Sequence, residues 1–153
     1  MERTFIYCLV IIFFGTVAPK QNPLNRRQTR LMQLVQIAKQ LKTCVNDTDP
    51  ALLSTPENVE KHCEESALKC FQEAPLKPLN NEEKKMRFDV LIKQLRRKLP
   101  QREARKTNPK CPSCDSFKMK PPQEFLNSLQ SLLQKMISYD HHSNHHHCHG
   151  QCT

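Results

Sequence analysis

Glycine is absent from the whole central part of this chain. The 153 residues contain two glycines, Gly15 and Gly150, and each stands near one end. Phosphate-binding and dinucleotide-binding loops depend on glycine, and so do tight two-residue β-hairpins. Tryptophan is missing and aromatic residues make up only 6% of the chain, so the core must rely on Leu, Ile, Val and Met. These features argue against a nucleotide-binding enzyme and a hairpin-rich β protein, and they favour a helical fold.

Four segments carry apolar residues at the helical spacing i, i+3, i+4 and i+7. The fourth is the clearest, because Pro121 and Pro122 can open a helix and the apolar stripe then continues to Ile137. Capping residues and acidic first turns mark the starts of the second and third segments. A long basic link at 101–120 is able to cross the length of a bundle. We therefore expect an all-α four-helix bundle, with helices at about residues 25–42, 55–74, 81–99 and 121–137.

The two ends of the chain differ from this body. Arg3, an apolar run at 5–14 and small residues up to Ala18 predict a secretory signal peptide. The run is shorter than the roughly 20 apolar residues that a membrane span needs, and no later segment reaches that length. We expect a secreted, extracellular chain with three parts: a signal peptide at 1–18 (cleaved between 18 and 24), a four-helix domain at 25–139, and a disordered His/Cys-rich tail at 140–153.

The cysteines predict disulfide bonds. Cys63 and Cys70 share one face of the second helix, but their Cα atoms would be about 10.5 Å apart, beyond the limit of about 7 Å for a disulfide. Each must reach a distant partner, and Cys111 and Cys114 are the natural pair. The Cys-x-x-Cys spacing also fits a redox motif or half a zinc site, but the secretory route favours oxidation. Cys8 leaves with the signal peptide, and three other cysteines remain. Their spacing assigns no disulfide partner to any of them: Cys44, Cys148 and Cys152.

Several segments resemble one cytokine family. The most specific run is Cys111-Pro-Ser-Cys-Asp-Ser, followed by Pro121-Pro-Gln-Glu-Phe-Leu and Ser131-Leu-Leu-Gln-Lys-Met-Ile. Shorter matches lie at 32–34, 40–42, 45–47, 63–72 and 92–98. From the signal region to Ile137 the chain is similar to the interleukin-2 family of short-chain four-helix cytokines, and within it to the interleukin-21 branch. Cys44 departs from the family pattern, which has an aromatic residue there, and the tail has no counterpart.

The resemblance implies an up-up-down-down helix order and the disulfide pairs Cys63–Cys111 and Cys70–Cys114. It also implies two partners, a private interleukin-21 receptor and the common cytokine receptor gamma chain, which signal through Janus kinases and STAT factors in lymphocytes. The gamma chain would contact Gln134 and Ile137 on the fourth helix. The private receptor would contact the first and third helices at nine matching positions: Arg26, Arg30, Gln33, Ile37, Val90, Lys93, Arg96, Arg97 and Lys98.

Each candidate surface also has a plainer interpretation. The basic residues, Arg27 among them, can form an ordinary solvated face, and a cluster of this density also attracts heparan sulfate. Ile137 can belong to the core rather than to the edge of the apolar stripe. With a net charge of +9, the main alternative function is a secreted basic module that binds heparan sulfate or acts as an antimicrobial. Its binding would weaken steeply with salt.

The remaining motifs carry little chemistry. Asn46-Asp47-Thr48 is a glycosylation acceptor. The body has one histidine, His62, and shows no catalytic constellation, so we expect no enzyme activity, no cofactor, no nucleic-acid partner and a monomer. Histidines of the tail can hold zinc or copper loosely, but we expect a solvated tail and no metal site; these are His141, His142, His145, His146, His147 and His149.

Overall fold

The computed structural model describes residues 23–46, 51–100 and 110–148. The signal peptide expected at 1–18 lies outside these residues. Four α-helices make up most of the described chain: α2 (Pro23–Leu41), α3 (Glu64–Glu73), α4 (Glu82–Leu95) and α5 (Pro122–Cys148). Two short strands, β1 (Leu53–Ser54) and β2 (Met119–Lys120), and two 3₁₀ turns, Lys61–Cys63 and Cys114–Ser116, complete the fold. No helix in the described ranges is both long enough and apolar enough to cross a membrane.

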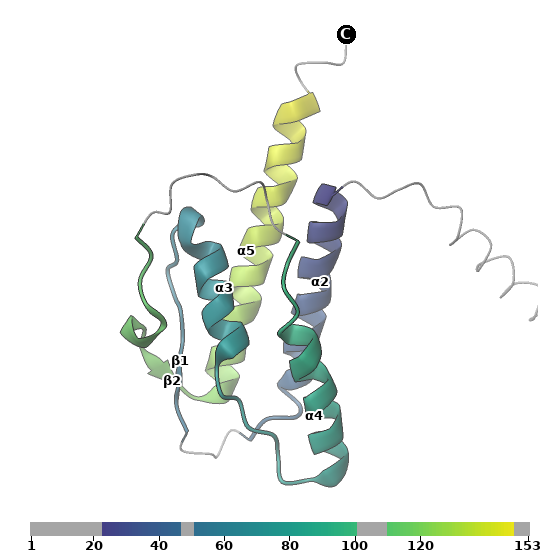
Figure 1. Ribbon diagram of the computed structural model, residues 1–153, viewed down its shortest axis with the longest axis vertical. Helices are drawn as coiled ribbons and strands as arrows, with labels where there is room; N and C mark the ends of the chain where they lie inside the picture. The colour runs from purple at the N-terminus through teal and green to yellow at the C-terminus, as the bar shows by residue number, and fades with distance from the viewer. Residues whose placement is uncertain (1–22, 47–50, 101–109, 149–153) are drawn as a thin grey trace, which may run out of the picture.

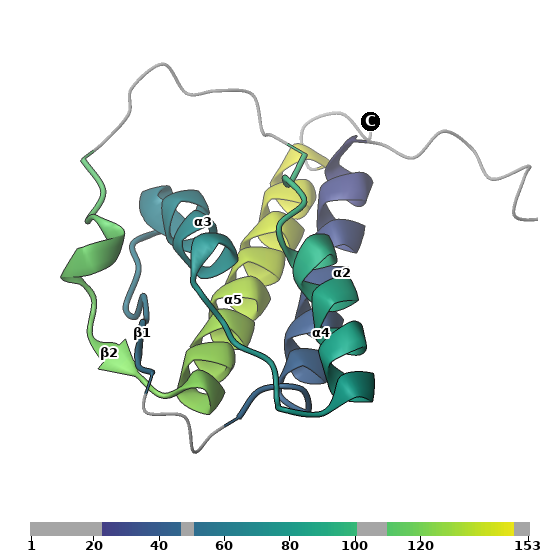
Figure 2. The ribbon, with the colours of Figure 1, turned by 60° about the horizontal axis from the view of Figure 1, so that its bottom comes forward.

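The helices form an up-up-down-down bundle. Figure 1 shows α2 and α3 running in one direction and α4 and α5 in the other, and Figure 2 gives the same arrangement from a second side. Such an order needs two long connections, one before α3 and one before α5. The connections pair with each other through β1 and β2, which are antiparallel with Leu53 opposite Lys120. The all-α four-helix prediction is confirmed.

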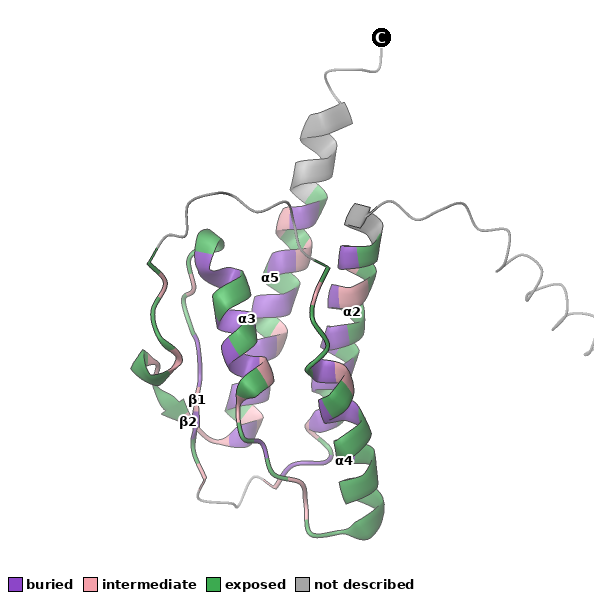
Figure 3. Cartoon of the chain, in the orientation of Figure 1, coloured by how far each residue is buried: buried purple, intermediate pink, exposed green. Residues whose placement is uncertain are grey.

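The core lies where the apolar stripes of the four helices meet. The most extensive contact joins α2 to α5. Phe71 of α3 and Phe125 of α5 are fully buried, and their ring centroids are 5.0 Å apart with a tilt of 56°, a favourable aromatic geometry. Leucines make up more than half of the rest of the core, and Figure 3 shows the buried residues on the inner faces of the helices.

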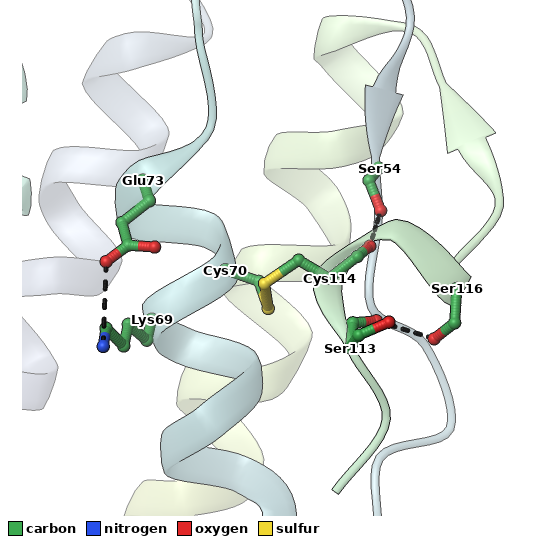
Figure 4. The surroundings of a disulfide bond; sticks show 7 residues. All are labelled: Ser54, Lys69, Cys70, Glu73, Ser113, Cys114 and Ser116. Atoms are coloured by element: carbon green, nitrogen blue, oxygen red, sulfur yellow. Dashed lines mark hydrogen bonds and ion pairs between the residues drawn. A yellow bond between two sulfur atoms is a disulfide. The ribbon is translucent and has the colours of Figure 1, made fainter.

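Two disulfides fasten α3 to the chain that precedes β2. Cys63 is bonded to Cys111 and Cys70 to Cys114, and the Cα atoms of each pair are 5.5 Å apart. These are the pairs that the resemblance implies. Figure 4 shows the Cys70–Cys114 bond between α3 and the second 3₁₀ turn, where Ser54 donates a hydrogen bond to the Cys114 carbonyl. Cys44 is a buried free cysteine.

The second helix begins later than expected. The sequence predicts a cap at Thr55, but the chain turns helical only at Lys61 and α3 starts at Glu64. The Thr55 amide instead donates to the Lys118 carbonyl at 2.9 Å, which continues the pairing of the two connections. The Thr55 hydroxyl donates to the Leu53 carbonyl at 2.8 Å. The cap prediction from local sequence is wrong here because Thr55 belongs to the chain that pairs with a distant segment, and the residues after it are not helical.

The third helix begins as expected and ends early. The Asn81 side chain accepts hydrogen bonds from the amides of Glu83 and Lys84 at 3.0 and 3.3 Å, the expected asparagine cap. The helix was expected to reach 99, but α4 ends at Leu95. Leu99 still packs against the core without being helical.

The fourth helix is longer than expected. Pro122 is its first residue, and the Phe125 amide donates to the Pro121 carbonyl at 3.0 Å, so the prolines open the helix as predicted. Its far end contradicts the expectation of a disordered tail from residue 140, because α5 continues to Cys148. Asp140 is buried and pairs with Arg27 of α2, which ties this part of the helix to the bundle. Residues 149–153, including Cys152 and His149, lie outside the described residues.

Candidate functional site

Arg30 joins α2 to α4 on one exposed side of the bundle. Its guanidinium donates to the Gln94 carbonyl near the end of α4 and to the Gln33 side chain at 3.5 Å. Because the two helices are antiparallel, the chain before Arg30 lies beside the end of α4, and the chain after it lies beside the middle of α4. The positions expected from the first and third helices are therefore brought together. We define the α2–α4 surface by eight residues: Arg26, Arg30, Gln33, Val90, Lys93, Arg96, Arg97 and Lys98.

The α2–α4 surface is basic towards the end of α4 and carries one apolar side chain, Val90, further back on that helix. Seven of the eight residues are exposed, and Arg30 is half-buried. Burial, and to a smaller extent the positive charge of Arg97, lower the pKa of Arg30 below its ordinary value. Val90 is 55% exposed and adds an apolar side chain to the surface. An acidic partner with an apolar contact would complement this surface.

The basic end of the surface is held by side chains from other helices. Gln72 of α3 donates to the Leu95 carbonyl at 2.9 Å and to the Arg97 carbonyl at 3.3 Å. Arg27 of α2 donates to the Pro100 carbonyl at 3.1 Å. The Leu95 carbonyl is one that a longer α4 would have used internally, and Gln72 satisfies it instead. The early end of α4 is thereby stabilised, and Arg97 and Lys98 lie on irregular rather than helical chain.

The second candidate surface lies on α5. Gln134 is exposed, and Ile137 is half-buried and packs against the core, so Ile137 stands at the edge of the apolar stripe. Along α5, contacts with α2 occur both before Gln134 and after Ile137. Gln28 bonds to the exposed His141 at 2.6 Å, and Lys42 bonds to Gln130. We call Gln134 and Ile137 the α5 surface.

Residues 5–138 match the family model described as Interleukin 15. The match covers most of the chain, including both surfaces and both disulfides. The chain belongs to the interleukin 15 family. Chains of this family are short-chain cytokines of the interleukin-2 and interleukin-15 type. Such cytokines act through cytokine receptors, are typically secreted and are not enzymes.

Ile37 is the one expected contact residue that this interleukin 15 family chain does not expose. It is only 5% exposed and belongs to the core cluster, so we exclude it from the α2–α4 surface. Arg27 also differs from expectation. It was expected with the basic face, but it is 5% exposed and is paired with the carboxylates of Glu65 and Asp140. Ion pairing, rather than solvent, accommodates its charge.

Sequence reasoning missed the residues that flank the α5 surface in this interleukin 15 family chain. Lys61 lies over the ring of Tyr139, with its ammonium 4.7 Å from the ring centroid, and Lys135 lies 6.0 Å from the same ring. Lys135 also donates to the Val59 carbonyl at 2.8 Å. The helical spacing of Lys135 and Tyr139 carried a signal, but Lys61 comes from a distant segment that the sequence alone did not place.

One group of potential metal ligands occurs among the described residues of this interleukin 15 family chain. Donor atoms of His62, Cys63 and Cys111 lie within 4.8 Å of one another. The two sulfurs are bonded to each other, however, and a metal would need them as thiolates. This group is therefore the surroundings of a disulfide, beside a cavity of about 260 Å³ that Val59 and Phe117 help to line.

Proposed function

We propose that this chain is a cytokine of the interleukin-21 type, which joins two different receptors with two different surfaces. The α2–α4 surface would bind a private interleukin-21 receptor, and the α5 surface would bind the common cytokine receptor gamma chain. Bringing the two receptors together would trigger Janus kinase and STAT signalling in lymphocytes. The proposal includes secretion after removal of a signal peptide at 1–18.

The observation that carries this proposal is the pairing of α2 with α4 through Arg30. The resemblance named residues on two separate helices, and the antiparallel contact of Arg30 with Gln94 supports a single continuous surface for them. The surface is rich in positive charge that is free to meet a partner, since Lys93, Arg97 and Lys98 are exposed. Complementary charge mainly accelerates association and selects the partner.

The α5 surface supports the second half of the proposal. Gln134 offers a polar group and Ile137 an apolar edge about one turn away on the same helix. A small apolar contact with a polar rim is the usual anatomy of a protein interface. Gln134 and Ile137 lie on α5, whereas the α2–α4 surface lies on two other helices, so a different part of the chain would meet each receptor.

Binding to purified receptor ectodomains tests the proposal. We expect binding of the interleukin-21 receptor ectodomain that persists at high salt, and recruitment of the gamma chain ectodomain to the resulting complex. The main alternative is a basic module that recognises heparan sulfate through charge alone, and such binding would fall steeply with salt. Retention on heparin with no binding to either ectodomain would favour that alternative and contradict our proposal.

Asn46 is proposed as a glycosylation site of the same secreted chain. It is half-buried and follows the buried Val45 in the connection after α2. Its side chain belongs to the sequon Asn46-Asp47-Thr48, of which the last two residues lie outside the described ranges. A loss of mass on treatment of the secreted protein with an N-glycosidase, absent in an Asn46→Gln variant, would test this site.

A further inference from the structure

The segment that follows α4 carries three of the basic residues of the α2–α4 surface. Arg96, Arg97 and Lys98 come directly after Leu95, the last residue of the helix. The backbone amides of Arg96 and Arg97 still bond back to the Ile92 and Gln94 carbonyls, at 3.0 and 3.3 Å. Beyond them the chain is irregular, so its direction depends on contacts with the rest of the molecule.

Gln72 makes three of these contacts by itself. Its side-chain amide donates to the Leu95 carbonyl at 2.9 Å and to the Arg97 carbonyl at 3.3 Å, which uses both of its hydrogens. Its own backbone carbonyl accepts a bond from the side chain of Arg96, Nε to O, at 3.2 Å. One residue of α3 therefore fixes both the backbone of the segment and the direction of one of its arginines.

The backbone of Gln72 is itself held in place by contacts of its neighbours on α3. It follows the fully buried Phe71, whose ring packs on Phe125 of α5. Two residues before it, Cys70 is bonded to Cys114. A side chain transmits a position only if its own backbone is fixed, and here the helix, the aromatic contact and the disulfide fix it.

Two arginines of α2 also bond to carbonyls near this segment, but each has another role. Arg30 bonds to the Gln94 carbonyl and is itself part of the α2–α4 surface. Arg27 bonds to the Pro100 carbonyl and forms buried ion pairs that stabilise the bundle. Gln72 belongs to neither proposed surface and carries no charge. Its effect on binding can therefore be separated from direct contact and from charge.

We infer that Gln72 is a positioning residue for the private receptor site, which holds the Arg96–Lys98 segment in the arrangement that the receptor binds. This inference rests on the proposed function of the α2–α4 surface. Without Gln72 the three basic residues keep their charges but lose a fixed geometry. Binding then has to order the segment, and that cost reduces affinity and shortens the lifetime of the complex.

The test replaces Gln72 by Met, which has a similar length and no donor. We expect the Kd for the interleukin-21 receptor ectodomain to rise about tenfold, mainly through faster dissociation, because two neutral hydrogen bonds are lost. The salt dependence of binding and the Kd for the gamma chain ectodomain should not change. Hydrogen exchange at the Arg96 and Arg97 amides should become faster. A Gln72→Lys variant, which keeps donors on a flexible chain, should recover part of the affinity.

Lys69→Met is the matched control. Lys69 is exposed on α3, one turn before Gln72. It forms an ion pair with Glu73 on the same helix rather than a contact with the segment after α4. This variant should leave both affinities and the exchange of the Arg96 and Arg97 amides unchanged.

Three results would overturn the inference. Equal weakening of both receptors by Gln72→Met, together with lower thermal stability, would give Gln72 a purely structural role. Unchanged affinity and unchanged amide exchange would show that the segment holds its arrangement without Gln72. Faster exchange with unchanged affinity would show that the arrangement does not matter to the receptor. The double variant Arg97→Glu/Lys98→Glu distinguishes a failure of the Gln72 inference from a failure of the proposed function. If this variant also leaves binding of the private receptor unchanged, the α2–α4 surface is not the receptor site.

Discussion

Arg27 on α2 and Asp140 on α5 form an ion pair in which both side chains are almost completely buried. The distance from Arg27 Nε to Asp140 Oδ2 is 3.3 Å, and a second arginine nitrogen lies 2.9 Å from the exposed carboxylate of Glu65 on α3. A further guanidinium nitrogen bonds to the Pro100 carbonyl. Three helices and the chain after α4 therefore meet at one guanidinium.

Replacing Arg27 by Met should destabilise the protein strongly. The change removes the arginine from a buried ion pair, and removing one partner of such a pair costs about 3 to 5 kcal/mol. Arg26→Met is the matched control, because Arg26 is the exposed neighbour and surface changes cost about 0.5 kcal/mol or less. Urea unfolding of both variants measures the difference. Similar losses in the two variants would contradict the role of the buried pair.

Charge reversal at Arg97 and Lys98 should weaken binding of the private receptor and spare the gamma chain. Both residues are exposed at the basic end of the α2–α4 surface. We expect the association rate for the private receptor to fall at least about tenfold at low salt, because complementary charge mainly acts on association. Surface plasmon resonance on each ectodomain measures this. Equal losses on both receptors would indicate misfolding or a different docking surface.

Aspartate at both Gln134 and Ile137 should weaken binding of the gamma chain and spare binding of the private receptor. The double variant would place unpaired charge in an apolar contact, a cost of several kcal/mol to gamma chain binding. Ile137 is half-buried, so the fold should survive with a loss of about 1 to 2 kcal/mol. The variant should bind the private receptor without STAT phosphorylation and act as an antagonist.

Asn127→Asp serves as the control for that variant, since Asn127 is an exposed position about two turns before Gln134 on α5. It should signal normally. Full signalling by a folded Gln134→Asp/Ile137→Asp variant would remove the α5 surface from the proposal, and circular dichroism establishes whether the variant is folded.

Acid should remove the stabilising contribution of Glu57. Hydrogen bonds from Lys120 and Ser128 and the positive charge of Lys120 hold the pKa of Glu57 below its ordinary value of 4.5. A carboxylate with a lowered pKa stabilises the fold above its ordinary pKa, and the contribution disappears as pH falls through the lowered value. The gap in Tm between the wild type and Glu57→Gln should therefore be small but measurable near about pH 7 and shrink as the pH falls below the ordinary pKa of 4.5. A gap that persists in acid would mean that packing, not charge, was lost.

The helical core could be predicted from the sequence because it depends on local periodicity. The stripe from Phe125 to Met136 repeats at the helical spacing, and these residues are buried as the pattern requires. The capping role of Asn81 could also be predicted, because a capping side chain bonds to amides only two and three residues away. Features of this kind need no knowledge of the rest of the chain.

The exceptions all depend on partners that are far away in sequence. Thr55 does not start a helix because its segment pairs with the chain at Lys118, and α4 stops early beside Gln72. Arg27 can be buried because it pairs with Asp140, which is 113 residues away in sequence but adjacent in space. Geometry excluded a Cys63–Cys70 bond, but it could not choose among the remaining pairings. At Ile37 the position matched the family pattern, and only the packing showed that it is buried.

The two disulfides connect the same two stretches of chain, and this makes them partly redundant. Their separations of 48 and 44 residues are nearly equal, so either bond alone closes a large loop that contributes about 4 kcal/mol. Once one bond exists, the other closes a ring of only about ten residues and adds about 2.5 to 3 kcal/mol. Removing either pair by serine substitution should therefore cost less than half of what removing both costs, a coupling that a double-mutant cycle measures. In a weakly reducing medium the protein would then tolerate the opening of one bond and lose its fold only when the second opens.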